Sequence, residues 1–185
     1  MARQGCRMIV VCPRSRLEAV LADARPGRLV SLLSIGHEPF RPETIPAEHQ
    51  LHLSMHDIVE DRPGLVSPAA AHVEALLSFA RRWDRRAPLL IHCYAGVSRS
   101  PAAAFIVAAA LQPERDELEL ARELRALSPS ATPNPCLVRL ADAALRREGR
   151  MTAAIEAIGR GQDCSEGEEF RWRLRALDRQ AAGNT

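Results

Sequence analysis

The segment from Leu89 to Leu111 constrains this chain more than any other part of its sequence. It begins with the apolar run Leu89-Leu90-Ile91, passes through a polar loop and ends in the alanine-rich run Ala102–Leu111. A short apolar run before a tight loop is typical of a buried strand, and Pro101 suits the first turn of a helix. The segment therefore predicts a strand–loop–helix unit, with Ser100 in the position of a helix cap.

The rest of the chain contains further runs that are typical of strands and helices. The expected strands are Arg7–Cys12, Leu29–Ser34, Leu51–Ile58 and Pro88–His92, and the expected helices are Ser15–Ala24 with Ser15 as its cap, Val73–Ala80, Ala102–Leu111, Leu118–Leu127 and one after Pro135. Strands that alternate with helices, followed by a helical second half, indicate an α/β fold. We expect a mainly parallel central sheet of four to five strands, flanked by helices.

A polar break from Gly159 to Gly167 separates the end of the chain from the rest. A chain of 185 residues fits one ordinary domain. We expect that domain to cover residues 1–160 and to be followed by a C-terminal extension over residues 161–185, with a short helix over Glu168–Gln180.

Composition and charge exclude several classes of protein. A net charge of +2 gives no basis for a nucleic-acid partner. The longest apolar run, Ala102–Leu111, is too short to span a membrane, and the amino terminus lacks the apolar core of a signal peptide. The five cysteines are an odd number without a disulfide framework, which indicates reduced thiols. We therefore expect a cytoplasmic protein with no nucleic-acid or membrane partner, while nothing in the sequence indicates its oligomeric state.

The loop from His92 to Ser100 contains the residue types of a phosphate-binding site. From Cys93 to Arg99, its backbone N–H groups would surround the N-terminus of a helix, an arrangement that binds a phosphate-sized anion. Gly96 provides a residue free of Cβ restrictions. We expect the helix N-terminus to favour the thiolate of Cys93, the form that attacks phosphorus. The planar guanidinium of Arg99 can hold two phosphoryl oxygens.

The spacing of Cys93 and Arg99 is specific within this chain. Six residues after the other four cysteines stand Cys12, Glu18, Asp142 and Phe170, so only Cys93 has an arginine there. The Ser100 hydroxyl can hydrogen-bond the thiolate and assist its departure, whereas His92 orients the loop. The backbone that binds phosphate would come from Tyr94, Ala95, Gly96, Val97 and Ser98, together with Arg99.

This loop resembles the signature loop of the cysteine-based protein tyrosine phosphatases, in particular their compact dual-specificity-like branch. The resemblance runs from about Leu29 to Arg147, and Ser128–Asn134 is similar to the proline–asparagine segment that opens a late helix in that branch. It implies hydrolysis of a phosphate monoester in two steps through a phosphocysteine, without metal or other cofactor. The expected substrate is a phosphorylated protein or a small phosphomonoester.

The resemblance also implies an aspartate, on a loop after an upstream strand, that protonates the leaving group. Asp57, Glu60 and Asp61 compete for this role. Asp57 directly follows the strand-like Leu51–His56, which favours it because active-site loops begin at strand ends. Asp61 lies 32 residues before Cys93 (93 − 61) against 36 for Asp57 (93 − 57), and the shorter spacing is closer to the compact branch. We choose Asp57 and keep Asp61 as the alternative.

Two other sequence features suggest sites that we reject. His49, His52 and His56 do not share one face of a strand, and no carboxylate or cysteine completes a metal-ligand set. The segment that begins at Cys12 resembles the loop of the low-molecular-weight phosphatases, but Glu18 stands where their arginine is required.

Two functional alternatives stay open. One is a phosphoinositide or small-metabolite phosphatase of the same superfamily, and the other is a phosphate-binding module without catalysis. The uncharged interior of the loop favours a substrate with a single phosphate, because the loop supplies one cation. The intact Cys93, Arg99 and Ser100 argue against the binding module.

Overall fold

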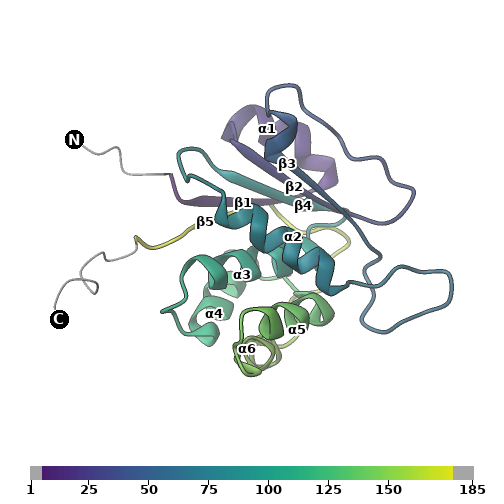
Figure 1. The fold of residues 1–185 in the computed structure, drawn as a ribbon, viewed down its shortest axis with the longest axis vertical. Coiled ribbons are helices and arrows are strands. Elements are labelled where there is room, and N and C mark those ends of the chain that lie inside the picture. The colour runs from purple at the N-terminus through teal and green to yellow at the C-terminus, as the bar shows by residue number, and fades with distance from the viewer. Residues whose placement is uncertain (1–5, 177–185) are drawn as a thin grey trace.

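Five strands form the central sheet of the computed structural model, which describes residues 6–176 (Figure 1). They are β1 Met8–Pro13, β2 Arg28–Leu33, β3 Gln50–Ser54, β4 Leu89–Cys93 and β5 Phe170–Arg173, in the order β3-β2-β4-β1-β5. The first four run parallel, and β5 runs antiparallel to β1. The expected mainly parallel sheet is confirmed, although β3 ends at Ser54 rather than at Ile58.

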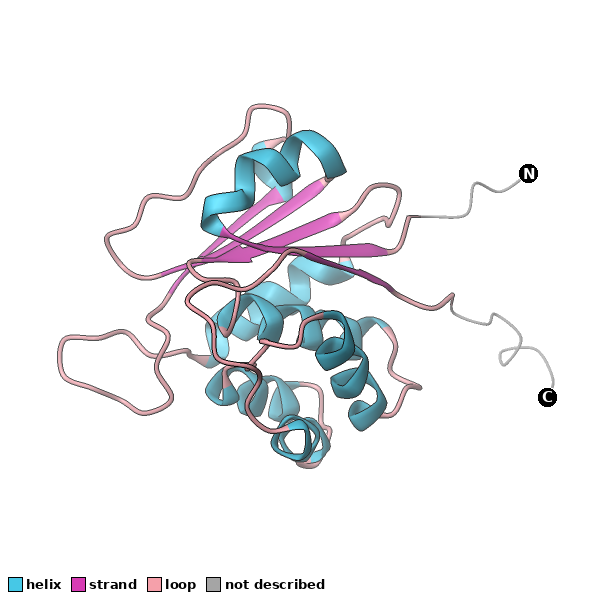
Figure 2. Ribbon diagram, turned by 180° about the vertical axis from the view of Figure 1, so that it is seen from behind, coloured by secondary structure: helices cyan, strands magenta, loops and turns pink. Residues whose placement is uncertain are grey.

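Six helices flank this sheet. They are α1 Leu17–Ala24, α2 Ala70–Arg81, α3 Arg99–Leu111, α4 Glu117–Leu127, α5 Pro135–Ala144 and α6 Arg150–Ile158. Helix α1 covers one face of the sheet, and the other five helices lie on the opposite side (Figure 2). A small core lies between α1 and the sheet, and a larger one lies between the sheet and the other helices. Within residues 6–176, no helix is long and apolar enough to cross a bilayer.

Helix α3 is the central helix of the larger core. Every residue of α3 except Ala110 is buried, and the helix contacts β1, β4, α2, α4 and α5. Its many alanines allow this approach on all sides, because small side chains let neighbouring elements pack closely without voids. The strand–loop–helix unit predicted from the sequence therefore forms the middle of the molecule.

The carboxyl ends of the four parallel strands meet at one edge of the sheet. Two long loops leave this edge, residues 34–46 between β2 and β3 and residues 55–69 between β3 and α2, and both project from the molecule in Figures 1 and 2. The short loop between β4 and α3 begins at the same edge. Ligands of open parallel sheets bind outside such an edge, so the fold places the predicted site there.

The helix predicted for Glu168–Gln180 is wrong in the part that the structure describes. Residues 170–173 form β5, with Phe170 and Trp172 buried and the two arginines between and after them exposed. This alternation has the two-residue period of a strand that is buried on one face. Strand β5 also pairs with β1, which would otherwise expose unpaired backbone groups at the sheet edge. Residues 177–180 lie outside the described residues.

Two predicted helix caps are also wrong. A 3₁₀ turn over Arg14–Arg16 precedes α1, and the Ser15 hydroxyl donates to the carboxylate of Glu166 at 2.5 Å instead of capping the helix. Helix α3 begins at Arg99, so Ser100 lies inside its first turn. The serine is therefore free to contact the loop that precedes the helix.

Candidate active site

Cys93 ends β4 and begins the loop that leads into α3; residues 93–99 are called the Cys93 loop below. Its side chain is buried, with 2% of the residue exposed. The sulfur lies 3.1 Å from the Ser100 hydroxyl and accepts a hydrogen bond from the Gly96 N–H at 3.3 Å. The Gly96 N–H and the N-terminus of α3 create positive electrostatic potential at the sulfur.

The backbone of the Cys93 loop turns its N–H groups inward. Four of its carbonyl oxygens accept hydrogen bonds from other segments: Tyr94 from Arg14 (3.0 Å), Ala95 from Gly167 (2.8 Å), Val97 from Thr132 (2.8 Å) and Ser98 from Asn134 (3.3 Å). In a planar trans peptide the N–H points opposite to the carbonyl, so the N–H groups that follow these carbonyls face the centre of the loop. An anion at the centre would meet several donors at once.

Gly96 is required in this loop for two reasons. Its φ angle is 73°, in the left-handed region that other residues adopt rarely. A Cβ at this position would also lie 3.0 Å from the backbone nitrogen of Pro13, at the end of β1. A side chain here would therefore strain the loop and push it away from the sheet.

Arg99 is anchored by one end of its guanidinium. Nη1 donates to the Met55 carbonyl at 2.9 Å and to the Ser34 hydroxyl at 3.2 Å, and 5% of the side chain is exposed. Its Nε has no hydrogen-bond partner among residues 6–176 and lies 3.7 Å from an oxygen of Asp57. The starts of the two long loops thus fix the arginine while leaving donor capacity for an oxyanion.

Asp57 contacts both the Cys93 loop and the start of α5. Its Oδ1 accepts hydrogen bonds from the Ser98 hydroxyl at 2.7 Å and from the Asn134 amide at 2.8 Å, while Oδ2 faces Arg99. Asn134 is itself fixed as the N-cap of α5, because its Oδ1 accepts from the Leu137 N–H at 3.0 Å. About a third of the Asp57 side chain, 34%, stays accessible to solvent and substrate.

Asp61, the alternative acid, lies elsewhere. It accepts a hydrogen bond from the Ser67 hydroxyl at 2.5 Å inside the exposed loop 55–69. Glu60 is also exposed in this loop. Of the three carboxylates considered, Asp57 is the one with hydrogen bonds to the Cys93 loop, so the geometry favours the strand-end argument over the spacing argument.

His92 directly precedes Cys93 and is completely buried. Its Nε2 is 2.7 Å from the Ser31 hydroxyl on the neighbouring strand β2. Burial lowers the pKa of His92 to about 4, so the ring is neutral at neutral pH. A neutral, hydrogen-bonded ring between two strands fits a role in orienting the loop rather than in proton transfer.

Comparison with solved structures relates this fold to known proteins. A Cydia pomonella PTP-2 phosphatase matches with 21% identity over 70% of this chain and 78% of that chain, at a TM-score of 0.53. Human DUSP28 matches with 17% identity over 75% and 89%, at 0.55, and PTPMT1 in complex with PI(5)P with 15% over 80% and 90%, at 0.50. The chain has the protein tyrosine phosphatase fold. The expected resemblance is confirmed at this level, and no family model and no curated protein matches the sequence.

The residues of the two rejected sites have other environments in the structure. Burial raises the pKa of Cys12 to about 12, so this thiol stays protonated and is a poor nucleophile. Within residues 6–176, no three ligating side chains come together as a metal site. His52 instead contacts the Ser54 hydroxyl at 2.8 Å, and His56 accepts a hydrogen bond from the Val66 N–H at 2.9 Å.

Three contacts that support the site were not predicted from the sequence, although Asn134 itself was predicted to lie at the start of a helix. Ser34 holds Arg99, Asn134 holds Asp57, and Gly167 bonds the Cys93 loop from outside. A Cβ on Gly167 would lie 2.9 Å from the Gly96 carbonyl oxygen. Asn134 followed by Pro135 is typical of a helix start, since Asn is a favoured cap and proline a favoured first residue. The sequence around Ser34 and Gly167 contains no pattern that predicts their contacts with the site.

Proposed function

We propose that this protein is a phosphoric monoester hydrolase that acts through a phosphocysteine intermediate, of the tyrosine or dual-specificity type. The observation that carries the proposal is the environment of the Cys93 sulfur. It lies at the N-terminus of a buried helix, within hydrogen-bond distance of Ser100 and of the Gly96 N–H, at the sheet edge that also holds Arg99 and Asp57. This arrangement supplies a nucleophile, an oxyanion site and an acid in one place.

In the first step the Cys93 thiolate attacks phosphorus. A sulfur–phosphorus bond forms as the bond from phosphorus to the leaving oxygen breaks, and the acid form of Asp57 donates a proton to that oxygen. The inward N–H groups and the unanchored side of Arg99 stabilise the charge on the three equatorial oxygens. The first product is an alcohol or a phenol.

In the second step a water molecule attacks the phosphocysteine. The Asp57 carboxylate accepts a proton from this water as the new oxygen–phosphorus bond forms. The sulfur–phosphorus bond breaks, and the Ser100 hydroxyl donates a hydrogen bond to the departing thiolate. Inorganic phosphate leaves, and the enzyme returns to its starting state with its thiolate and its protonated aspartate.

Two observations bear on the class of substrate. PTPMT1, one of the proteins that share this fold, has been solved in complex with PI(5)P, which keeps a phosphoinositide phosphatase as the alternative function. The interior side chains of the Cys93 loop (Tyr94, Ala95, Val97 and Ser98) carry no cation. A single arginine suits one phosphate group, which favours a phosphorylated protein or a small phosphomonoester. We also propose a cytoplasmic location, because all five cysteines, which lie within residues 6–176, are free thiols.

The proposal is tested by steady-state hydrolysis of aryl phosphates, phosphopeptides and phosphoinositides by the wild type and by Cys93→Ser in parallel. We expect turnover by the wild type alone, inhibition by vanadate and by alkylation of Cys93, and no effect of chelators. Denaturation during turnover should trap phosphate on Cys93. Turnover by Cys93→Ser, with contamination excluded, would sink the phosphocysteine mechanism, and binding without turnover would indicate a phosphate-binding module.

A further inference from the structure

Exposed apolar side chains gather at the edge of the sheet that holds the candidate active site. Seven large hydrophobic residues within residues 6–176 are between 39% and 61% exposed: Ile35, Phe40, Val59, Leu65, Val66, Tyr94 and Leu127. The first six belong to the loops that leave the carboxyl ends of the strands, and Leu127 ends α4. Single exposed apolar residues are ordinary, but six of them on the loops that leave one edge of the sheet indicate a binding surface.

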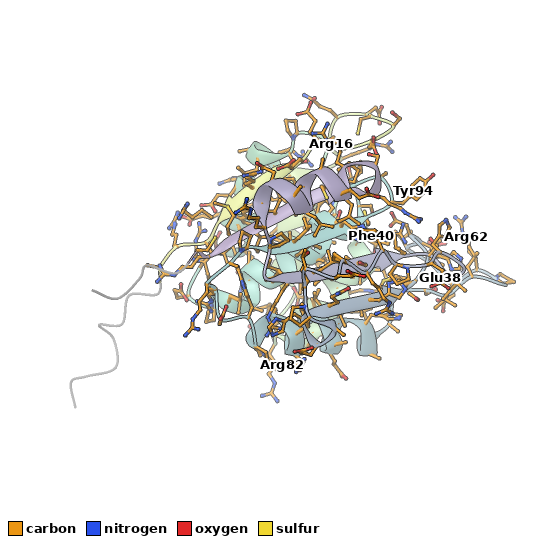
Figure 3. The ribbon with its side chains drawn as sticks, turned by 90° about the horizontal axis from the view of Figure 1, so that it is seen from above. Arg16, Glu38, Phe40, Arg62, Arg82 and Tyr94 are labelled. Carbon is orange, nitrogen blue, oxygen red and sulfur yellow. The ribbon has the colours of Figure 1, made fainter. Side chains whose placement is uncertain are left out.

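Two of these side chains are tied to the site through the strand ends. Tyr94 directly follows Cys93, and its ring meets His37 of loop 34–46 edge-on, with ring centroids 6.1 Å apart. Ile35 directly follows Ser34, whose hydroxyl holds Arg99. Figure 3 shows Tyr94 at the same end of the molecule as Glu38 and Arg62, which belong to the two long loops.

Two more are tied to the site through loop 55–69. Val59 follows Ile58, whose carbonyl accepts a hydrogen bond from Asn134 at 3.3 Å. Val66 pairs with His56, the residue before Asp57, because the His56 N–H donates to the Val66 carbonyl at 2.8 Å. Ile35, Val59, Val66 and Tyr94 are called the apolar rim below.

The negative charge of the two long loops disfavours anionic ligands at this rim. Apart from Asp57, the proposed acid, residues 34–46 and 55–69 contain four acidic residues (Glu38, Glu43, Glu60 and Asp61) and two basic ones (Arg41 and Arg62), a net charge of −2. Surfaces that bind anionic lipids or multiply phosphorylated headgroups carry clusters of Lys and Arg. The acidic loops therefore disfavour such ligands, and also disfavour peptides with acidic flanks.

We infer that the substrate is a phosphorylated protein segment with apolar, non-acidic residues beside the phosphorylated side chain, and that the apolar rim binds those residues. This inference rests on the proposed function. An extended peptide advances about 3.3 Å per residue, so we expect the neighbours one or two positions away to lie over the loops beside the Cys93 loop while that loop holds the phosphate. Apolar flanks gain from burial against the rim, and the absence of acidic flanks avoids repulsion by the loops.

The inference is tested with three phosphopeptides that share the phosphorylated residue and differ in their flanks: apolar, neutral polar or acidic. We expect kcat/KM to be highest for the apolar flanks and lowest for the acidic ones, by about tenfold or more. Ile35→Ser, Val59→Ser and Val66→Ser should each lower kcat/KM for the apolar peptide by about five- to twentyfold, the effect of removing a partly buried aliphatic side chain. The same variants should hydrolyse a small aryl phosphate at the wild-type rate.

Leu127→Ser is the matched control, because Leu127 is similarly exposed but lies outside the rim. This variant should keep the wild-type kcat/KM for both the apolar peptide and the aryl phosphate. Titration of Cys93→Ser with the three peptides measures the flank preference without turnover and should give the same order of affinities. Equal values for all three peptides, or equal losses with peptide and aryl phosphate, would overturn the inference while leaving the proposed function intact. Faster hydrolysis of phosphoinositides in anionic vesicles would assign the rim to lipid, and failure to hydrolyse any of these substrates would refute the proposed function instead.

Discussion

The Cys93 loop and the two long loops meet at the same edge of the sheet but are built differently. The Cys93 loop is bonded through its carbonyl oxygens to three distant parts of the chain: the start of the turn after β1, the segment before α5 and the segment before β5. The start of loop 55–69 is bonded to the site through Met55, Asp57 and Ile58. The part beyond it contains hydrogen bonds within the loop, such as those from Val66 to His56 and from Ser67 to Asp61. Loop 34–46 likewise bonds His37 to Ser34 and Ile45 to Pro42.

This difference separates the chemistry from the recognition of the substrate. A change in the Cys93 loop or its supports disturbs donors that every phosphate ester must meet, so it should affect all substrates. A change in the long loops beyond Ser34, Met55 and Asp57, the residues that bond the site, leaves those donors in place and should affect only substrates that extend beyond the phosphate. The following predictions test this division, from the largest expected effect to the smallest.

Cys93→Ser should remove turnover of every substrate, a loss of roughly 10⁴-fold or more, because a serine hydroxyl in this site does not ionise. The circular dichroism spectrum and the melting temperature should stay close to the wild type, since the two side chains are similar in size. Vanadate or phosphopeptide binding to the variant should persist. If the variant lost binding as well as turnover, Cys93 would also be needed to hold the loop in its binding conformation.

Arg99→Lys should lower kcat/KM for aryl phosphate by about 10²–10³-fold, because a point charge cannot reproduce a two-pronged contact with phosphoryl oxygens. A lysine can still donate to Met55 or Ser34, so the variant should remain folded. Steady-state kinetics and a thermal melt measure the two effects separately. A variant that kept most of its rate would disprove bidentate recognition.

Asp57→Asn should slow aryl phosphates with poor leaving groups by about 10²-fold and those with good leaving groups much less, because a good leaving group needs little protonation. The rates are compared across a series of phenols of different acidity. Asp61→Asn is the matched control, and its rates should depend on the leaving group as those of the wild type do. If Asp61→Asn shows the leaving-group effect instead, the acid lies in the outer part of loop 55–69, beyond the residues that bond the Cys93 loop, and the division between the two regions fails.

Gly167→Ala should lower kcat for both aryl phosphate and peptide by about tenfold, because a Cβ 2.9 Å from the Gly96 carbonyl oxygen must displace the Cys93 loop. Gly64→Ala in loop 55–69 is the paired variant. Gly64 has φ of 78° with open space around it, so alanine there should cost about 1 kcal/mol of stability and leave the rate on aryl phosphate unchanged. Equal rate losses in both variants would show that the two regions are not independent.

The smallest effect is on stability and arises behind the Cys93 loop. Because burial lowers the pKa of His92 to about 4 from its ordinary 6.5, the unfolded chain binds the proton more tightly than the folded one between these values. The free energy of unfolding should therefore fall by up to about 3 kcal/mol as the pH is lowered from 6.5 to 4. Urea unfolding at several pH values measures this slope, and His92→Asn should flatten it. An unchanged slope in that variant would assign the acid sensitivity to other groups.

The parts of the site that the sequence predicted are those that lie close together along the chain. Cys93, Gly96, Arg99 and Ser100 fall within one loop, so their spacing alone indicated their proximity. The choice between Asp57 and Asp61 depended on where β3 ends and how the following loop folds back, and neither is visible in a single sequence. Ser34 and Gly167 are brought to the loop by the order of the strands, which local patterns do not specify.

The fold was predicted to a similar extent and for the same reason. Buried parallel strands and one-sided helices leave periodic apolar patterns, which located the four parallel strands and α1 to α5. Strand β5 was missed because its two buried positions, Phe170 and Trp172, lie among charged residues that are equally compatible with a helix. What makes this segment a strand is the open edge of β1, a partner more than 150 residues earlier in the chain.

The bond from Gly167 to the Cys93 loop also has a consequence for the order in which the protein becomes active. Synthesis from the amino terminus completes the nucleophile, the arginine and the acid long before it reaches Gly167 and the strand that follows. Until then, the carbonyl of Ala95 lacks its partner and β1 is still an open edge. A nascent chain therefore carries all of its reactive groups without the backbone support that aligns them. We therefore expect the Cys93 loop to reach its final alignment only after this segment has emerged from the ribosome.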